Sequence, residues 1–139
     1  MSTNAMIALV RREKVGRGLL VLAALINLLP GLGAVSVSFA RSAYGVEIVG
    51  ADMEVLLRHR AMLFAILGVG LFAAVFRPRL RTAAVSSNAA SFGGFILLAV
   101  TNRPVNAALE RIAWIDVAGL VALALGAVLL RGGPERPHC

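Results

Sequence analysis

The chain has 139 residues, of which 59% are hydrophobic and 15% charged, and its mean hydropathy is +0.85. A single soluble domain of this size cannot bury so much apolar surface, so the composition excludes a water-soluble globule. The net charge of +7 and the pI near 11.5 are typical of nucleic-acid-binding proteins. No basic run is interleaved with aromatic residues, however, so no nucleic-acid partner is predicted.

Four apolar stretches approach the roughly 20 residues that a helix needs to cross a hydrocarbon core about 30 Å thick. The connections between them are short, so neighbouring helices are expected to be antiparallel. The sequence therefore predicts an all-α fold, an integral membrane four-helix bundle. Its parts are a basic N-terminus at 1–17, one transmembrane domain at 18–130 with spans at about 18–39, 55–76, 82–102 and 109–130, and a disordered tail at 131–139.

The cations lie mainly on one side of these spans. With both termini in the cytoplasm, the inner segments carry nine cations and two acids, a net charge of +7, and the outer residues carry five of each sign. An excess of Lys and Arg marks the cytoplasmic side of a membrane protein. The sequence therefore predicts a multi-pass protein of the cell (cytoplasmic) membrane with its N-terminus and C-terminus inside.

One alternative concerns the first span. Its basic flank, its apolar run and Ser38-Phe39-Ala40 resemble a secretory signal with a small-residue cleavage site. Such signals have an apolar core of about 7 to 15 residues, and this run is longer, so an uncleaved helix is the favoured interpretation.

Small and polar residues recur at helical spacing in every span. Membrane helices pack through such residues, because lipid offers no hydrophobic drive for helix association. We therefore expect these stripes to face the interior of the bundle, and Phe92, on another face of the third span, to point outward. The stripes are Ala23, Asn27, Gly31 and Ala34; Ala61, Ala65 and Gly68; Ala84, Ser87, Asn88, Ser91 and Gly94; and Ala113, Asp116, Gly119 and Gly126.

Asp116 is the only charge inside a continuous apolar run, and such a residue is by default a functional candidate. Arg58 shares the small-residue face of the second span, so we expect it to turn inward, pair with Glu54 one helical turn away and reach Asp116. Arg60 lies on the opposite, leucine-rich face and is expected to extend to the outer headgroups. Tyr44 fits an outer interfacial belt of aromatic residues.

These residues lead to a functional hypothesis: a polar pocket near the outer leaflet that binds a small lipophilic molecule. If the protein is an enzyme, the expected chemistry is cofactor-free acid/base catalysis of the isomerase type, such as isomerisation, cyclisation or epoxide opening. The candidate catalytic residues are Asp116 as acid or base, Arg58 as its electrostatic partner and His59 as a proton relay. The candidate pocket-lining residues are Glu54, Asn27, Ser87, Asn88, Ser91, Asn106 and Glu110.

Each candidate also has a structural interpretation. An Arg58–Asp116 pair can fix helix register, and the buried amides and hydroxyls can form interhelical hydrogen bonds. The protein is then a non-catalytic accessory subunit or scaffold, which packs against a second copy or a larger membrane complex, such as a redox complex. A scaffold is expected to turn a small-residue stripe outward, whereas an enzyme is expected to turn all four stripes toward a cavity.

Cysteine and histidine are scarce. The single cysteine, Cys139, excludes an internal disulfide and a multi-cysteine metal site, and His138 beside it belongs to the tail. No metal and no cofactor are predicted. Small multidrug exporters also have four spans, but they carry an essential glutamate in the first helix, and the first span here contains no acid.

Several motifs resemble a known family. Tyr44-Gly45-Val46, Leu56-Leu57-Arg58-His59-Arg60-Ala61, Phe76-Arg77-Pro78, Asn106-Ala107-Ala108-Leu109 and Asp116 are similar to a family of small actinobacterial four-helix membrane proteins of undefined function. Its members are often labelled phosphopantetheine adenylyltransferase, but the His-x-Gly-His motif of that soluble enzyme is absent here. The architecture is also similar to the DoxX-like group, which includes redox-associated subunits. The resemblance implies a four-helix membrane fold with Arg58, His59 and Asp116 as a unit.

Overall fold

The computed structural model of the protein describes residues 3–131. These residues form five α-helices and two short 3₁₀ helices, with no strand among them. The fold is therefore all-α, as the sequence predicts. The elements are α1 (Thr3–Gly31), η1 (Leu32–Ala34), α2 (Val37–Tyr44), α3 (Ala51–Phe76), η2 (Pro78–Leu80), α4 (Arg81–Thr101) and α5 (Ala107–Arg131).

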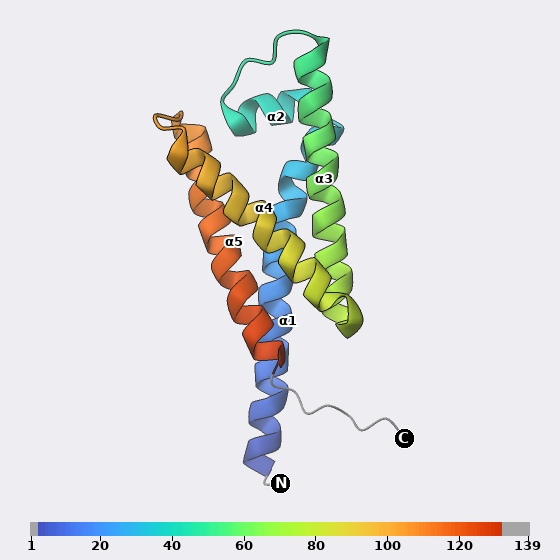
Figure 1. Ribbon diagram of the computed structural model, residues 1–139. Helices are drawn as coiled ribbons and strands as arrows, with labels where there is room; N and C mark the ends of the chain where they lie inside the picture. Colours follow the sequence, from blue (N-terminus) through green and yellow to red (C-terminus); the bar gives the residue numbers. More distant parts are fainter. Residues whose placement is uncertain (1–2, 132–139) are drawn as a thin grey trace.

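Four helical segments are long and apolar enough to cross a membrane. They comprise 32, 26, 24 and 25 residues and correspond to α1 with η1, α3, η2 with α4, and α5. Consecutive long helices run in opposite directions, and α1 begins at the same end of the bundle at which α5 ends (Figure 1). The predicted four-helix membrane bundle with antiparallel neighbours is confirmed. We call the end that carries Arg77, Arg79, Arg81 and Arg131 the basic end, and the opposite end the α2 end.

The first span differs from its predicted bounds of 18–39. Helix α1 begins at Thr3, so the basic residues of the N-terminal segment are helical, and an i,i+4 ion pair of 2.6 Å joins Arg17 to Glu13 in it. The helix ends at Gly31 and gives way to η1. The short helix α2 then starts after Ser36, whose side chain accepts a hydrogen bond from the backbone N–H of Phe39 at 3.3 Å. This N-cap separates α2 from α1.

Helix α2 ends at a left-handed glycine. Gly45 has φ 61°, and its N–H bonds to the carbonyl of Arg41 at 2.9 Å, which is the usual way in which a helix C-terminus is closed. Figure 1 shows α2 lying across the α2 end, between α3 and α5, and it contacts both helices. Helix α3 begins earlier than the predicted residue 55, and its first turn holds Asp52 and Glu54, which suits a helix N-terminus.

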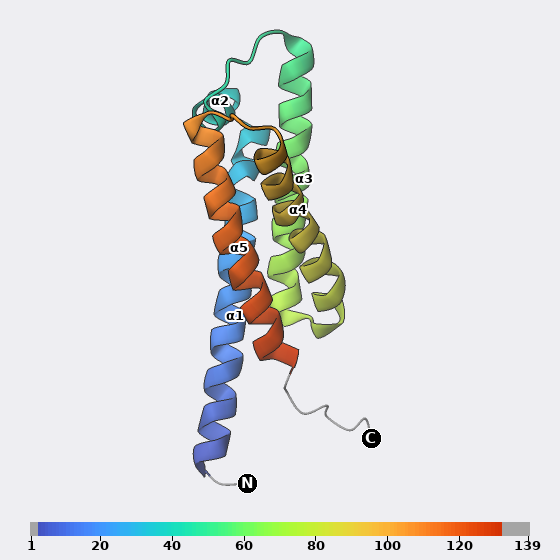
Figure 2. The same ribbon diagram turned by 60° about the vertical axis from the view of Figure 1, so that its left-hand side comes forward.

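Helix α1 lies beside both α3 and α5 (Figures 1 and 2). Glycines allow these close contacts. A Cβ on Gly68 of α3 would meet Leu28 Cγ at 2.6 Å, and one on Gly126 of α5 would meet Leu20 Cδ2 at 3.0 Å. The inward stripes predicted for the first, second and fourth spans are confirmed at these contacts. The buried core consists of Leu20, Ala23, Ala24, Leu71, Ala74, Val75, Ala84, Phe92 and Leu123.

Helix α4 follows its predicted inward stripe only in part, since Ala84 and Asn88 are buried as predicted. Phe92, which the sequence pattern places outward, is only 1% exposed, whereas Ser87 and Gly94, which the pattern places inside, are exposed. The Phe92 ring packs on Gly119 of α5, where the missing side chain leaves room for it. Ser87 needs no interhelical partner, because its hydroxyl donates to the carbonyl of Ala84 in its own helix at 3.1 Å.

Candidate functional site

Arg60 is the arginine that enters the space between helices at the α2 end. Its guanidinium carbon lies 5.5 Å from the ring centre of Tyr44, 5.2 Å from that of Phe64 and 5.2 Å from that of Phe95. These rings belong to α2, α3 and α4. The guanidinium therefore makes cation–π contacts with residues of three helices. The expectation that Arg60 lies on a lipid-facing surface is wrong, because its guanidinium lies among rings of α2, α3 and α4.

Arg58 does not pair with Asp116, which corrects the expected contact. Its Nη1 donates to Glu54 Oε1 at 3.1 Å, and its Nε donates to the carbonyl oxygen of Ala34 at 2.9 Å. Ala34 is the last residue of η1, where carbonyls lack helical partners. Arg58 therefore ties the end of the first span to α3 and is exposed, as is His59. Of this predicted pairing network, only the Glu54–Arg58 contact forms.

Asp116 is half-buried on α5 and interacts electrostatically with Arg60 and with Tyr44, although it is not in ion-pair contact with Arg60. Tyr44 is buried, with 8% of its surface exposed. Burial raises the pKa of its phenol above 10.0; the charge of Arg60 opposes this shift, and the charge of Asp116 adds to it. Tyr44 therefore keeps its hydroxyl proton at neutral pH and is available as a hydrogen-bond donor. We call Tyr44, Arg60 and Asp116 the outer polar cluster, after the side of the membrane that the charge distribution of the sequence predicts for the α2 end.

Asn106 fixes the position of Tyr44. Its amide nitrogen donates to the carbonyl oxygens of Tyr44 at 3.1 Å and Gly45 at 3.3 Å, and its side-chain oxygen accepts from the N–H of Leu109 at 2.9 Å. The same side chain thus caps α5 and holds the end of α2 against it. Asn106 and Glu110 are both exposed. Asn106 is therefore a positioning residue of the outer polar cluster.

Asn27 and Asn88 form a separate polar contact near the middle of the bundle. Asn27 Nδ2 donates to Asn88 Oδ1 at 2.5 Å, and Asn88 Nδ2 donates to the carbonyls of Ala84 at 2.8 Å and Leu67 at 3.2 Å. Asn88 is fully buried. This pattern is the interhelical hydrogen bonding that is the structural alternative to a pocket lining.

The Asn27–Asn88 contact is distant from the outer polar cluster. Asn88 precedes Phe95 by seven residues, which is about 10 Å along a helix. Ser91 is half-buried between these two positions, and Ser87 is exposed. The structure therefore divides the predicted pocket-lining residues between two places and does not bring them together into one site.

Sequence reasoning gave neither Arg60 nor Tyr44 a chemical role in the site. One usable signal was the aromatic residue Phe64, one helical turn after Arg60, because an i,i+4 cation–aromatic pair favours an arginine that stays among rings. Among residues 3–131, no three His, Cys, Asp or Glu side chains are grouped so that they could hold a metal ion. In comparisons with known proteins, the chain matches no family model, no curated protein and no solved structure.

Proposed function

We propose that this multi-pass membrane protein binds a small lipophilic molecule at the outer polar cluster. The observation that carries the proposal is the enclosure of Arg60 by three aromatic rings beside the half-buried Asp116. Ionisable groups among membrane helices are costly, and they are retained mainly where they serve a ligand, a proton or an ion. The proposal rests on four long helices that are apolar enough to cross a membrane.

The chemistry of the outer polar cluster suits a molecule with one polar end. Arg60 and the protonated Tyr44 hydroxyl are donors, and the Asp116 carboxylate is an acceptor. Aromatic faces next to these groups favour an apolar body, and ligand sites commonly combine apolar walls with a few polar anchors. In the catalytic form of the proposal, Asp116 transfers a proton and Arg60, in place of Arg58, stabilises the charge that develops. His59 is exposed and has no role in this version.

The first experiment asks whether the protein carries such a molecule. The full chain is purified in a mild detergent, extracted with organic solvent and analysed by mass spectrometry for co-purifying lipophilic compounds. We expect a compound enriched on the wild type and lost from Asp116→Asn, but retained by Glu47→Gln, which removes an exposed acid outside the cluster. If no compound is enriched, or if Asp116→Asn retains it fully, the proposal is rejected.

The second experiment tests the electrostatic coupling within the cluster. Tyr44 is the only tyrosine, so ultraviolet absorbance of the phenolate reports its titration directly. Because the charge of Asp116 raises the pKa of Tyr44 and the charge of Arg60 lowers it, Asp116→Asn should lower that pKa and Arg60→Gln should raise it. Glu47→Gln is the control. An unchanged titration in both cluster variants would show that the three groups are not coupled.

A second candidate function, a scaffold, is favoured by the surface of α4. Only 11% of its membrane-spanning stretch is buried inside the bundle, against 22 to 28% for the other three spans. Its outward surface carries small residues, and such surfaces let membrane helices approach closely. A Cβ on Gly94 would meet no atom within 4 Å. The exposed small residues are Ala83, Ser86, Ser87, Ala90 and Gly94.

The oligomeric state of the protein distinguishes this candidate. If α4 packs against a second copy, the wild type should be a dimer in detergent by native mass spectrometry, and Ala90→Leu should be monomeric. Val69→Leu, which enlarges an exposed side chain of α3, is the matched control and should leave the dimer intact. A monomeric wild type would contradict self-association through α4.

A further inference from the structure

A small cavity opens at the basic end, between α1, α4 and α5. Its volume is about 90 Å³, and Leu20 and Leu130 form apolar parts of its wall. A cavity needs roughly 10 to 15 Å³ to hold one water molecule, so this one has room for a polar group of several heavy atoms. The polar side chains on its wall are Arg81, Thr82, Ser86 and Arg131.

Arg81 is held in a fixed position at this cavity. Its Nε donates to the carbonyl of Ala74 and its Nη2 to the carbonyl of Val75, both at 3.3 Å. These carbonyls belong to the last turn of α3, where no helical partner is available. Arginine has five N–H donors, so these two bonds leave others free for a ligand. The guanidinium is therefore ordered before any ligand arrives.

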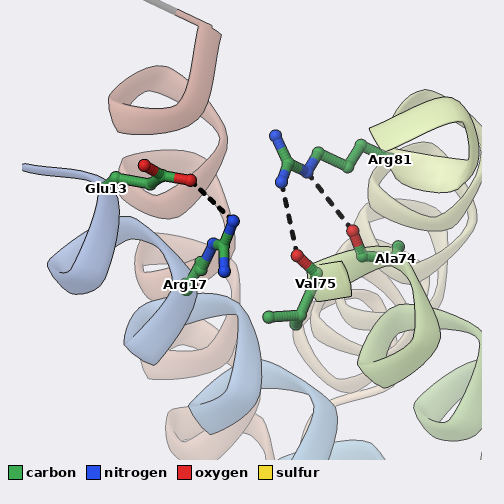
Figure 3. Close-up of polar contacts among 5 residues, drawn as sticks. All are labelled: Glu13, Arg17, Ala74, Val75 and Arg81. Carbon is green, nitrogen blue, oxygen red and sulfur yellow. Dashed lines mark hydrogen bonds and ion pairs between the residues drawn. The ribbon is translucent and has the colours of Figure 1, made fainter. Parts of the chain in front are cut away.

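Positive charge exceeds negative charge around the cavity. Arg17 and Arg81 point into the same gap between α1 and α3 (Figure 3), and Arg17 is partly neutralised by Glu13. Within the described part of the chain, neither Arg81 nor Arg131 forms an ion pair with a carboxylate. A bound anion would offset this excess of positive charge.

We propose that this cavity binds a phosphate group. Guanidinium groups bind phosphate oxygens through paired, charge-assisted hydrogen bonds, and the hydroxyls of Thr82 and Ser86 can donate to the remaining oxygens. The cavity is large enough for a phosphate group. The group comes either from a phospholipid headgroup or from free phosphate, and the basic end is the end predicted to face the anionic lipids of the cytoplasmic leaflet.

The test measures retention of a phosphate-bearing lipid by native mass spectrometry of the full chain, with phosphatidylglycerol compared with the phosphate-free lipid monogalactosyldiacylglycerol. The wild type should retain phosphatidylglycerol preferentially. Arg131→Gln and Ser86→Ala should each weaken retention, about tenfold for the arginine, because a charge-assisted hydrogen bond is worth about 1.5 kcal/mol or more. Arg111→Gln, which removes an exposed cation at the α2 end, is the control.

A second arm identifies the source of the phosphate. Inorganic phosphate is added to the lipid-depleted protein, and thermal stability is measured. Stabilisation of the wild type but not of Arg131→Gln identifies free phosphate as a ligand, and lipid retention without such stabilisation identifies a headgroup. Arg81→Gln also removes the cap of α3, so the exposed Arg131 provides the variant that keeps the fold. If both ligands bind the wild type, Arg131→Gln and Ser86→Ala equally, or if neither ligand binds, the proposal is overturned.

Discussion

The contact between α1 and α3 at Gly68 allows a sharp test of the packing. A Cβ at this position would lie 2.6 Å from Leu28 Cγ and 3.0 Å from the carbonyl oxygen of Ala24. The leucine side chain can rotate away, but the carbonyl belongs to the backbone of α1 and cannot. Gly68→Ala therefore has to push the two helices apart. Gly70 lies two residues later on the same helix, and a Cβ added there would meet no atom within 4 Å, so Gly70→Ala is the matched control.

The two substitutions make the same covalent change. The difference between their free energies of unfolding therefore measures the packing cost at Gly68. Overpacking of a well-packed site costs about 1 to 3 kcal/mol. Gly→Ala in an open helical position is neutral or stabilises by up to about 1 kcal/mol. Since the gain from Gly→Ala itself is common to both variants, we expect Gly68→Ala to be less stable than Gly70→Ala by about 1 to 3 kcal/mol, which is roughly a 5- to 150-fold difference in the folding equilibrium.

Pulse proteolysis in mixed micelles of mild detergent and sodium dodecyl sulfate measures this difference, because only unfolded chains are cleaved during a short pulse. The two variants are compared with the wild type over a range of dodecyl sulfate fractions. Equal stability of Gly68→Ala and Gly70→Ala would refute the close approach of α1 and α3 at Gly68, and with it the use of small residues to bring these helices together.

Three further predictions concern the rest of the bundle. Asn27→Leu and Asn88→Leu should show a coupling energy of about 0.6 to 1.7 kcal/mol in a double-mutant cycle of unfolding, as interhelical hydrogen bonds do, and zero coupling would contradict their contact. Burial raises the pKa of Tyr44 above 10.0, so the folded state holds the phenol proton more tightly than the unfolded chain. The resulting contribution to the free energy of unfolding is present below about pH 10 and is lost at higher pH. Tyr44→Phe should remove this part of the pH dependence. In a cysteine-free background, a cysteine at Arg79 should be protected from membrane-impermeant reagents added outside cells and one at Arg103 should react, and the reverse pattern would overturn the predicted orientation.

The number and the type of the long helices follow from composition and spacing, because the length of an apolar run determines whether it can cross a bilayer. The inward faces of three helices also follow, since small residues mark close helix contacts. The face of α4 could be predicted in this way only at Ala84 and Asn88. Phe92 is buried because Gly119 on another helix leaves space for its ring. The residue pattern within α4 gives no information about Gly119, which lies 27 residues after Phe92 on another helix.

The candidate site shows the same dependence on neighbouring elements. Asp116 stands out in the sequence as the charge within an apolar run, but the sequence pattern assigns the wrong arginine to it. Arg58 and Arg60 are two residues apart and point to nearly opposite sides of α3. Which side is enclosed is decided by α2, whose Tyr44 covers Arg60, and the predicted first span extends into residues 37–39 of α2. The sequence pattern selects Arg58 instead of Arg60 because it does not predict α2.

Arg60 and Arg81, which both contact groups between the helices, lie closer together along the bundle than a typical hydrocarbon core is thick. Arg81 binds carbonyls of Ala74 and Val75, which follow Arg60 by 14 and 15 residues, so the two cationic ends are about 22 Å apart along α3. A typical hydrocarbon core is about 30 Å thick. Lipid beside this surface has to become thinner, or else the charges lie below the headgroups and depend on their rings and carbonyls for solvation. The second case agrees with the contacts of Arg60 with three rings and of Arg81 with two carbonyls.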